Sequence, residues 1–189
     1  MTPTTGARQA GAQRSREALL TAAAAVFVES GVQAPVRTVA ERAGVGVGTV
    51  YRHFPTRADL VSAVYRHQVT ECVDLAERLR TQPVRPVEAL ERWVAAFLDF
   101  LVTKHGLSDA LRSEDPALAN LHALILDELV PACDALLRAG QDAGEVDPDV
   151  AALTLLRAVG NLAVLGPGYG REEARAMTVR LLAGCRTSP

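Results

Sequence analysis

Two short helical segments that meet at a glycine turn constrain the fold of this chain most strongly. Pro35 stands where the first residue of a helix would, and Gly44 ends the apolar periodicity that follows it. Beyond the turn, residues 47–54 predict a second short helix. Val50 and Phe54 are four residues apart, so they share the face that would pack against the first segment. This arrangement predicts a helix–turn–helix unit.

The opposite face of the second segment has the chemistry of a nucleic-acid contact. It centres on Gly48 and Arg52, with Thr49 and His53 on one flank and Tyr51 on the other. This face carries hydroxyl, guanidinium, imidazole and phenol groups and no acid. Arg can bind guanine edges through two hydrogen bonds, Thr can meet a base, and Tyr or His can hold a phosphate. The pattern is typical of a helix that enters a major groove.

Helix signals also flank this unit. Residues 14–30 predict a first helix, preceded by a polar arm over residues 1–13 that we expect to lack regular structure. Thr56 and Asp59 match a capping box, with Asp in place of the usual Glu. This box predicts the start of a long helix that runs to about Arg80.

The rest of the chain predicts five or six further helices, and no alternating strand pattern of useful length appears. A short helix is expected near residues 107–113. Asp147 and Pro148 predict the start of another helix, as a capping acid followed by a first-turn proline. Longer helices are expected over residues 87–104, 116–140 and 171–183. The sequence therefore predicts an all-α chain of about nine helices.

Charge is distributed unevenly along the chain. Residues 1–66 hold eight arginines and four acidic residues, a net charge of +4, whereas the remainder carries −6 and the whole chain −2. A basic first third on an acidic body indicates that one end meets a polyanion.

The sequence contains few signs of enzymatic chemistry. The three cysteines (Cys72, Cys133 and Cys185) are widely spaced and lack zinc-site spacing, so we expect reduced thiols in a cytoplasmic protein and no metal. No apolar run approaches the roughly 20 residues of a membrane-spanning helix. We find no glycine-rich phosphate loop or nucleophile elbow, so we expect no cofactor. An enzyme stays an alternative that only measured turnover would support.

The segment VRTVAERAGVGVGTVYRHFPTRADL, residues 36–60, resembles the TetR/AcrR family of transcriptional regulators. Its most specific part is the ordered Gly-Val, Gly-Thr and Tyr-x-His-Phe core, followed by Pro and a helix start. The resemblance implies that residues 13–72 form a three-helix DNA-binding domain, with the helix–turn–helix at about 35–54. It further implies that a long helix joins this domain to a C-terminal helical bundle over residues 73–189.

Carried over position by position, the resemblance implies which residues face DNA. Arg57, at the start of the long helix, would hold a phosphate. Gly46 departs from the family pattern, because Ser or Thr usually caps the helix there, and Val47 stands where Lys is common; fewer phosphate contacts are therefore expected. Taken alone, Tyr51 could equally be a packed aromatic residue, and His53 an ordinary surface group. The DNA-facing set is Val47, Gly48, Thr49, Tyr51, Arg52 and His53.

Candidate ligand-binding residues in the second part rest on the residues alone. Trp93 and Phe97 share one helix, where they either line a cavity between helices or pack in the core. A polar stripe at Thr154, Arg157 and Asn161 points into a pocket, crosses a dimer seam or faces water. His122 is either a ligand contact or a bundle histidine. The candidates are Trp93, Phe97, His122, Arg157 and Asn161.

The resemblance implies that the second domain binds a small effector and pairs with its twin through the last two helices. Residues 149–165 and 171–183 would then form a four-helix seam. We expect Ala174, Met177 and Leu181 to face inward, with the last two inside the seam or in the protomer's own core.

The predicted function is that of a homodimeric repressor of transcription. Two recognition helices roughly 34–36 Å apart would match successive major grooves of double-stranded DNA at a palindromic operator. A small hydrophobic effector that favours a mis-spaced conformation would release the operator by linkage. The alternatives are a ligand-dependent activator and a helical protein-interaction module whose basic end meets an acidic patch.

Overall fold

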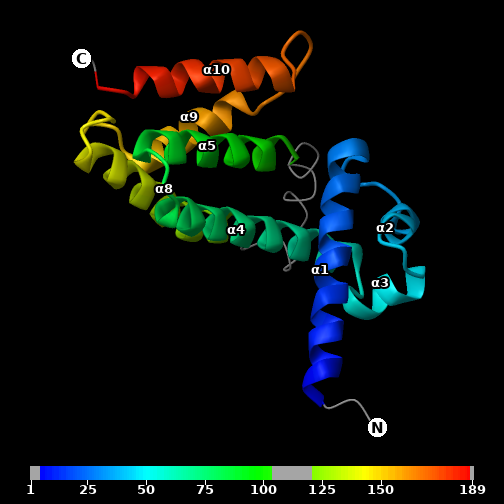
Figure 1. Cartoon of the computed structure of the whole chain (residues 1–189). Coiled ribbons are helices and arrows are strands. Elements are labelled where there is room, and N and C mark those ends of the chain that lie inside the picture. The colour runs from blue at the N-terminus through cyan, green and yellow to red at the C-terminus, as the bar shows by residue number, and fades with distance from the viewer. Residues whose placement is uncertain (1–4, 104–120, 188–189) are drawn as a thin grey trace. The chain divides into compact units, whose positions relative to one another are not determined.

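The structure, a computed structural model, describes residues 5–103 and 121–187 (Figure 1). Every regular element in these residues is a helix, so the all-α prediction is confirmed. The elements are α1 (Thr5–Ser30), α2 (Val36–Arg42), α3 (Val47–His53), α4 (Arg57–Thr81), α5 (Pro86–Thr103), α8 (Leu121–Asp142), α9 (Ala152–Leu162) and α10 (Arg171–Gly184). The helix expected near residues 107–113 lies outside the described residues.

The described chain divides into two compact units within α4, between His67 and Gln68. In the N-terminal unit, α2 packs against α1 and α3 packs against α2. Val50 and Phe54 are both buried, as their spacing predicted. The core of this unit is Leu19, Leu20, Ala23, Phe27, Val39, Ala40, Val50, Phe54, Leu60 and Val64.

The first helix is longer than the sequence pattern predicted. We expected an arm without regular structure over residues 1–13, but α1 begins at Thr5, so the expectation is wrong for residues 5–13. The segment contains Ala, Arg and Gln, which are good helix formers. Extending an existing helix by such residues avoids the cost of a new nucleus.

Two local signals set the ends of the short helices. Gly44 has a φ of +67°, a left-handed conformation that favours glycine, and this turn lets the amide of Val45 donate to the carbonyl of Ala40 at 3.0 Å. The predicted capping box is present at the start of α4. The Thr56 amide donates to an Asp59 carboxylate oxygen at 3.0 Å, and the Asp59 amide donates to the Thr56 hydroxyl oxygen at 3.0 Å.

The C-terminal unit is built around α5, which packs on α8, α9 and α10 (Figure 1). The inward face of α5 is apolar, and Trp93 and Val94 are fully buried on it. Further buried residues come from the other helices of this unit: Leu129, Cys133, Leu136, Leu155, Val159, Ala174 and Leu182.

The predicted start of α9 is wrong. Asp147 and Pro148 lie in the turn before the helix, which begins at Ala152. The Asp147 carboxylate accepts from the Asp149 amide at 2.8 Å, and the Gln141 side-chain amide donates to the Asp147 carbonyl at 3.1 Å and the Val150 carbonyl at 3.1 Å. These side-chain contacts satisfy backbone polar groups of the turn and compete with helix formation there.

The protomer buries one of the three residues expected to face inward on α10. Ala174 is buried as expected, but Met177 is 43% exposed and Leu181 is half-buried. Thr178 and Leu182 complete the buried stripe with Ala174. Thr178 tolerates burial because its hydroxyl donates to the Ala174 carbonyl at 2.8 Å.

Candidate nucleic-acid interface

The outer face of α3 is open to solvent in the described structure. Gly48, Tyr51 and Arg52 are exposed, and Tyr51 is 48% exposed despite its aromatic ring. Val47, Thr49 and His53 are half-buried on the flanks of this face. We call these six residues the recognition face. Because Val50 and Phe54 anchor the opposite side, the recognition face is held outward by a buried stripe.

The electrostatics of α3 favour an anionic partner. Among the described residues, Arg52 has neither a hydrogen-bond partner nor an ion-pair partner. Other arginines of this unit are engaged: Arg42 pairs with Glu29, and Arg37 pairs with Glu41 at 2.9 Å. α3 itself carries no acidic residue. The Arg52 guanidinium is therefore available to bind a base edge or a phosphate.

The start of α3 has a backbone cap alone. Gly46 takes the N-cap position, and the Thr49 amide donates to its carbonyl at 2.9 Å, with no side-chain cap hydrogen bond. A hydroxyl that could contact both the helix amides and a phosphate is therefore missing at this position, as the sequence indicated.

Arg57 makes contacts that sequence reasoning missed. Its Nη1 donates to the carbonyl of Val32 at 2.6 Å and its Nη2 to the carbonyl of Ala34 at 2.9 Å. The side chain is half-buried by these contacts, so it links the first turn of α4 to the loop between α1 and α2. A sequence signal for this contact was lacking, because the two partners are carbonyls more than 20 residues away.

The ligand-binding candidates of the C-terminal unit do not converge on one cavity. Trp93 is fully buried, stacks on Phe97 with ring centroids 5.6 Å apart, and donates from Nε1 to the Cys72 carbonyl at 2.8 Å. Arg157 and Asn161 are instead exposed on α9, as is Thr154. His122 belongs to α8, but its side chain lies outside the described part of the structure.

A groove between α5 and α10 was not predicted from the sequence. It has a volume of about 480 Å³, and Ala95, Leu98, Val179 and Leu182 contribute to its lining. Arg–carboxylate pairs lie at each end, between Asp99 and Arg175 and between Glu91 and Arg186. Trp93, Phe97, Arg157 and Asn161, the predicted ligand-binding residues whose side chains the structure describes, do not line it. Its lining residues come from two helices far apart in the sequence, so no local pattern indicated it.

The cysteines show no sign of a reactive or metal-binding site. Burial raises the pKa of the Cys72 thiol to about 12, with a smaller contribution from the Glu71 carboxylate. Burial likewise raises the pKa of Cys133 to about 12. The described residues contain no cluster of His, Cys, Asp and Glu suited to a metal ion. No helix in the described residues has the length and apolar character needed to cross a bilayer.

Comparison with known proteins agrees with this geometry. Residues 19–64 match the family described as bacterial regulatory proteins of the tetR family, and residues 85–186 match the C-terminal domain of SbtR-like transcriptional regulators. A relative from Brucella suis biovar 1 (strain 1330), the HTH-type transcriptional repressor BepR, is 27% identical over 180 residues, 93% of this chain and 80% of that protein.

Solved structures share this fold over most of the chain. The TetR transcriptional regulator SCO0520 of Streptomyces coelicolor is 32% identical, with a TM-score of 0.77 over 92% of this chain and 99% of that one. A TetR transcription regulatory protein of Mycobacterium vanbaalenii is also 32% identical, with a TM-score of 0.70 over 95% and 99% of the two chains. The chain therefore belongs to the TetR family of bacterial transcriptional regulators, which bind DNA and are not enzymes.

Proposed function

We propose that this chain represses transcription as a homodimer that binds a palindromic operator and is released by a small hydrophobic effector. The observation that carries the proposal is the exposed, acid-free recognition face, with the Arg52 guanidinium unpaired among the described residues. A buried packing corner would have placed this arginine and Tyr51 against protein. The similarity to a transcriptional repressor supports repression over activation.

Each residue of the recognition face takes a role that suits its chemistry. Arg52 reads a guanine edge through two hydrogen bonds, and Thr49 meets a base or a thymine methyl group. Tyr51 and His53 hold phosphates, and Gly48 lets the helix backbone approach the groove. Val47, the first residue of α3, offers an apolar contact to the DNA at the beginning of the recognition face. Arg57 contacts a phosphate only if its guanidinium leaves the two carbonyls or reaches past them.

Exposed apolar side chains on and beside the last two helices support dimer formation. Leu153 on α9 is 38% exposed, Val164 just beyond α9 is 66% exposed, and Met177 on α10 is 43% exposed. A second copy that covers these side chains would remove apolar area from water. The Arg157 and Asn161 side chains lie on the same exposed side of α9 and would cross this seam.

The effector acts through linkage between the two units. α4 contributes residues to both units, so a ligand that favours one position of α4 changes the spacing of the two recognition helices. We place the protein in the cytoplasm, where both an operator and a small hydrophobic metabolite are accessible.

The test is selection of bound sequences from a random duplex pool with the purified protein. The expected result is a consensus with two-fold symmetry whose half-site centres are about 10 base pairs, or a multiple of one turn, apart. Enrichment of no sequence above the starting pool would contradict sequence-specific binding. Enrichment of an asymmetric single site would contradict the dimeric arrangement.

A further inference from the structure

The groove between α5 and α10 has neutralised charges at both ends. Arg175 donates from Nη2 to both carboxylate oxygens of Asp99, at 2.8 and 2.9 Å. At the other end Arg186 donates from Nε to the Glu91 carboxylate at 3.1 Å. The earlier residue on α5, Glu91, pairs with the later arginine, Arg186, and Asp99 pairs with Arg175, so α5 and α10 are antiparallel. Glu91 and Asp99 are eight residues apart on α5, which makes the groove about 12 Å long.

The middle of the groove is apolar and hollow because its side chains are small. Leu98 and Leu182 are buried and form the floor. Ala95 and Ala183 are exposed and project little, whereas Val179 stands 67% exposed at the edge. The volume of about 480 Å³ lies within the range typical of small-molecule sites.

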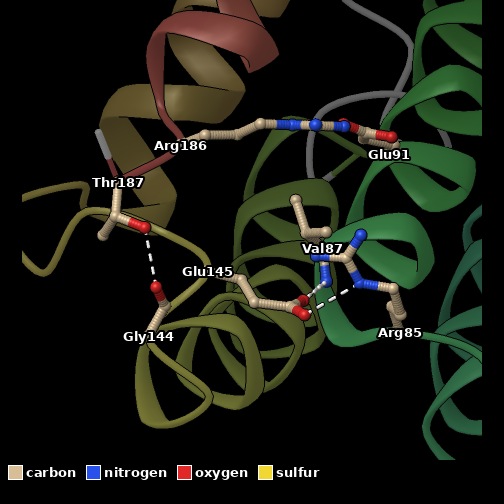
Figure 2. A network of polar contacts seen from close by, with 7 residues as sticks. All are labelled: Arg85, Val87, Glu91, Gly144, Glu145, Arg186 and Thr187. Carbon is tan, nitrogen blue, oxygen red and sulfur yellow. Dashed lines mark hydrogen bonds and ion pairs between the residues drawn. The ribbon is translucent and has the colours of Figure 1, made fainter. Parts of the chain in front are cut away.

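One end of the groove is fixed by a network of polar contacts (Figure 2). Beyond Arg186, the Thr187 hydroxyl donates to the Gly144 carbonyl at 2.6 Å. The Glu145 carboxylate accepts from the Val87 amide at 2.9 Å and from Arg85 Nε at 3.0 Å. The turn before α9 therefore holds both the end of α10 and the beginning of α5. A site whose walls are held in this way is formed before a ligand arrives.

We propose that this groove binds an elongated, uncharged, apolar small molecule of about 12 Å. Both arginines at its ends are already paired with carboxylates, so an anionic ligand would have to displace Asp99 or Glu91. A cationic ligand would likewise compete with an arginine for its carboxylate. An uncharged chain leaves both pairs intact and covers the exposed apolar surface between them. Binding in the groove does not depend on the proposed function, whereas release of DNA by the bound molecule rests on the proposed effector role.

The experiment measures binding of the neutral fluorescent probe N-phenyl-1-naphthylamine to the full chain in the absence of DNA. The variants Ala95→Leu and Ala183→Leu fill the groove from opposite helices, and both are expected to lower the affinity for the probe about tenfold. The matched control, Ala151→Leu, adds the same side chain at an exposed position outside the groove and is expected to bind as the wild type does.

Competition tests the charge argument. At about pH 8, where a carboxylate is ionised, 1-decanol is expected to displace the probe at lower concentration than decanoate. Asp99→Asn leaves Arg175 without this partner, so decanoate should compete about two- to fivefold better than against the wild type. Equal competition by the two molecules in the wild type would contradict the proposal. So would an Asp99→Asn variant from which decanoate displaces the probe no better than it does from the wild type.

Two further results would overturn the proposal. One is retention of wild-type probe affinity by both groove-filling variants. The other is a shift of either variant from dimer to monomer in light scattering, which would assign the groove to a second copy. Release of DNA by the probe is measured separately. Probe binding that the groove variants abolish, with unchanged operator affinity, supports the site and contradicts the effector role alone.

Discussion

Arg57 donates a 2.6 Å hydrogen bond to the carbonyl of Val32, so the first residue of α4 holds the loop that precedes α2. A second donation to Ala34 at 2.9 Å uses the other terminal nitrogen of the guanidinium. The family resemblance gave this arginine a phosphate contact, and the two roles make different predictions. A positioning role affects all DNA sequences alike without changing the number of phosphates contacted.

Arg57→Ala should weaken binding to every duplex and lower the stability of the N-terminal unit by about 1–3 kcal/mol, because the carbonyls of two buried residues, Val32 and Ala34, lose their donor. Arg57→Lys should rescue little, since one ammonium replaces a fork that spans two acceptors. The deciding measurement is the dependence of operator affinity on salt. An unchanged slope fits the positioning role, whereas a slope reduced by about 0.9 would show a lost phosphate contact.

Trp93→Phe should destabilise the C-terminal unit by about 1–3 kcal/mol, because it removes the Nε1 hydrogen bond to Cys72 and part of a fully buried ring. Urea unfolding followed by circular dichroism measures the change. Val179→Ala, which truncates a side chain that is 67% exposed, is the control and should stay within about 0.5 kcal/mol. Equal stability of Trp93→Phe and the wild type would place this residue outside the packed core.

Leu153→Asp and Met177→Asp should each shift the protein from dimer to monomer, since both side chains are exposed on the last two helices. A buried like-charge pair at a two-fold seam is costly. Sedimentation velocity over a concentration series measures the shift. Val28→Asp changes an equally exposed side chain of the N-terminal unit and should leave the mass unchanged. Dimers that persist in both α9 and α10 variants would contradict the proposed seam.

Glu145 should make stability depend on acid pH. The Val87 amide, followed by the Arg85 guanidinium, lowers the pKa of this carboxyl below its ordinary value of 4.5, while desolvation opposes the shift. A lowered pKa in the folded state means that the stabilisation is present above the unfolded pKa and is lost as the pH falls through the folded pKa. Thermal unfolding measured from neutral pH downward should therefore decline more steeply for the wild type than for Glu145→Gln. Parallel curves would show that the network does not depend on this charge.

Much of the DNA-binding end could be predicted because its signals are local. The recognition face follows from helical periodicity over seven residues, and the Thr56–Asp59 capping box spans four. The family resemblance favoured DNA contacts for Tyr51 and His53, which taken alone could equally have been a packed aromatic residue and an ordinary surface group. The start of α9 was predicted too early because the Gln141 side chain donates to the carbonyls of Asp147 and Val150 and so stabilises a turn where a helix was expected.

The groove could not be predicted because it depends on contacts between distant segments. Its two ion pairs join residues 76 and 95 positions apart in the chain. The buried stripe of α10 was predicted only in part, because one of its members is a threonine that bonds its own helix at a position that hydropathy would give to solvent. Arg57 illustrates the same limit, since its side chain binds backbone carbonyls, which every residue has and which no residue type in the sequence can indicate.

The central claim is that the outer face of α3 reads bases, and the most direct test is the specificity ratio of Arg52→Ala. The ratio compares affinity for the selected duplex with affinity for a scrambled duplex of the same length at one salt concentration. Arg138→Ala, which removes an exposed arginine of α8, is the control. We predict that Arg52→Ala lowers the ratio, reducing the difference in binding free energy between the two duplexes by about 1–3 kcal/mol, while affinity for the scrambled duplex changes little. A ratio equal to that of the wild type and of Arg138→Ala would contradict the account.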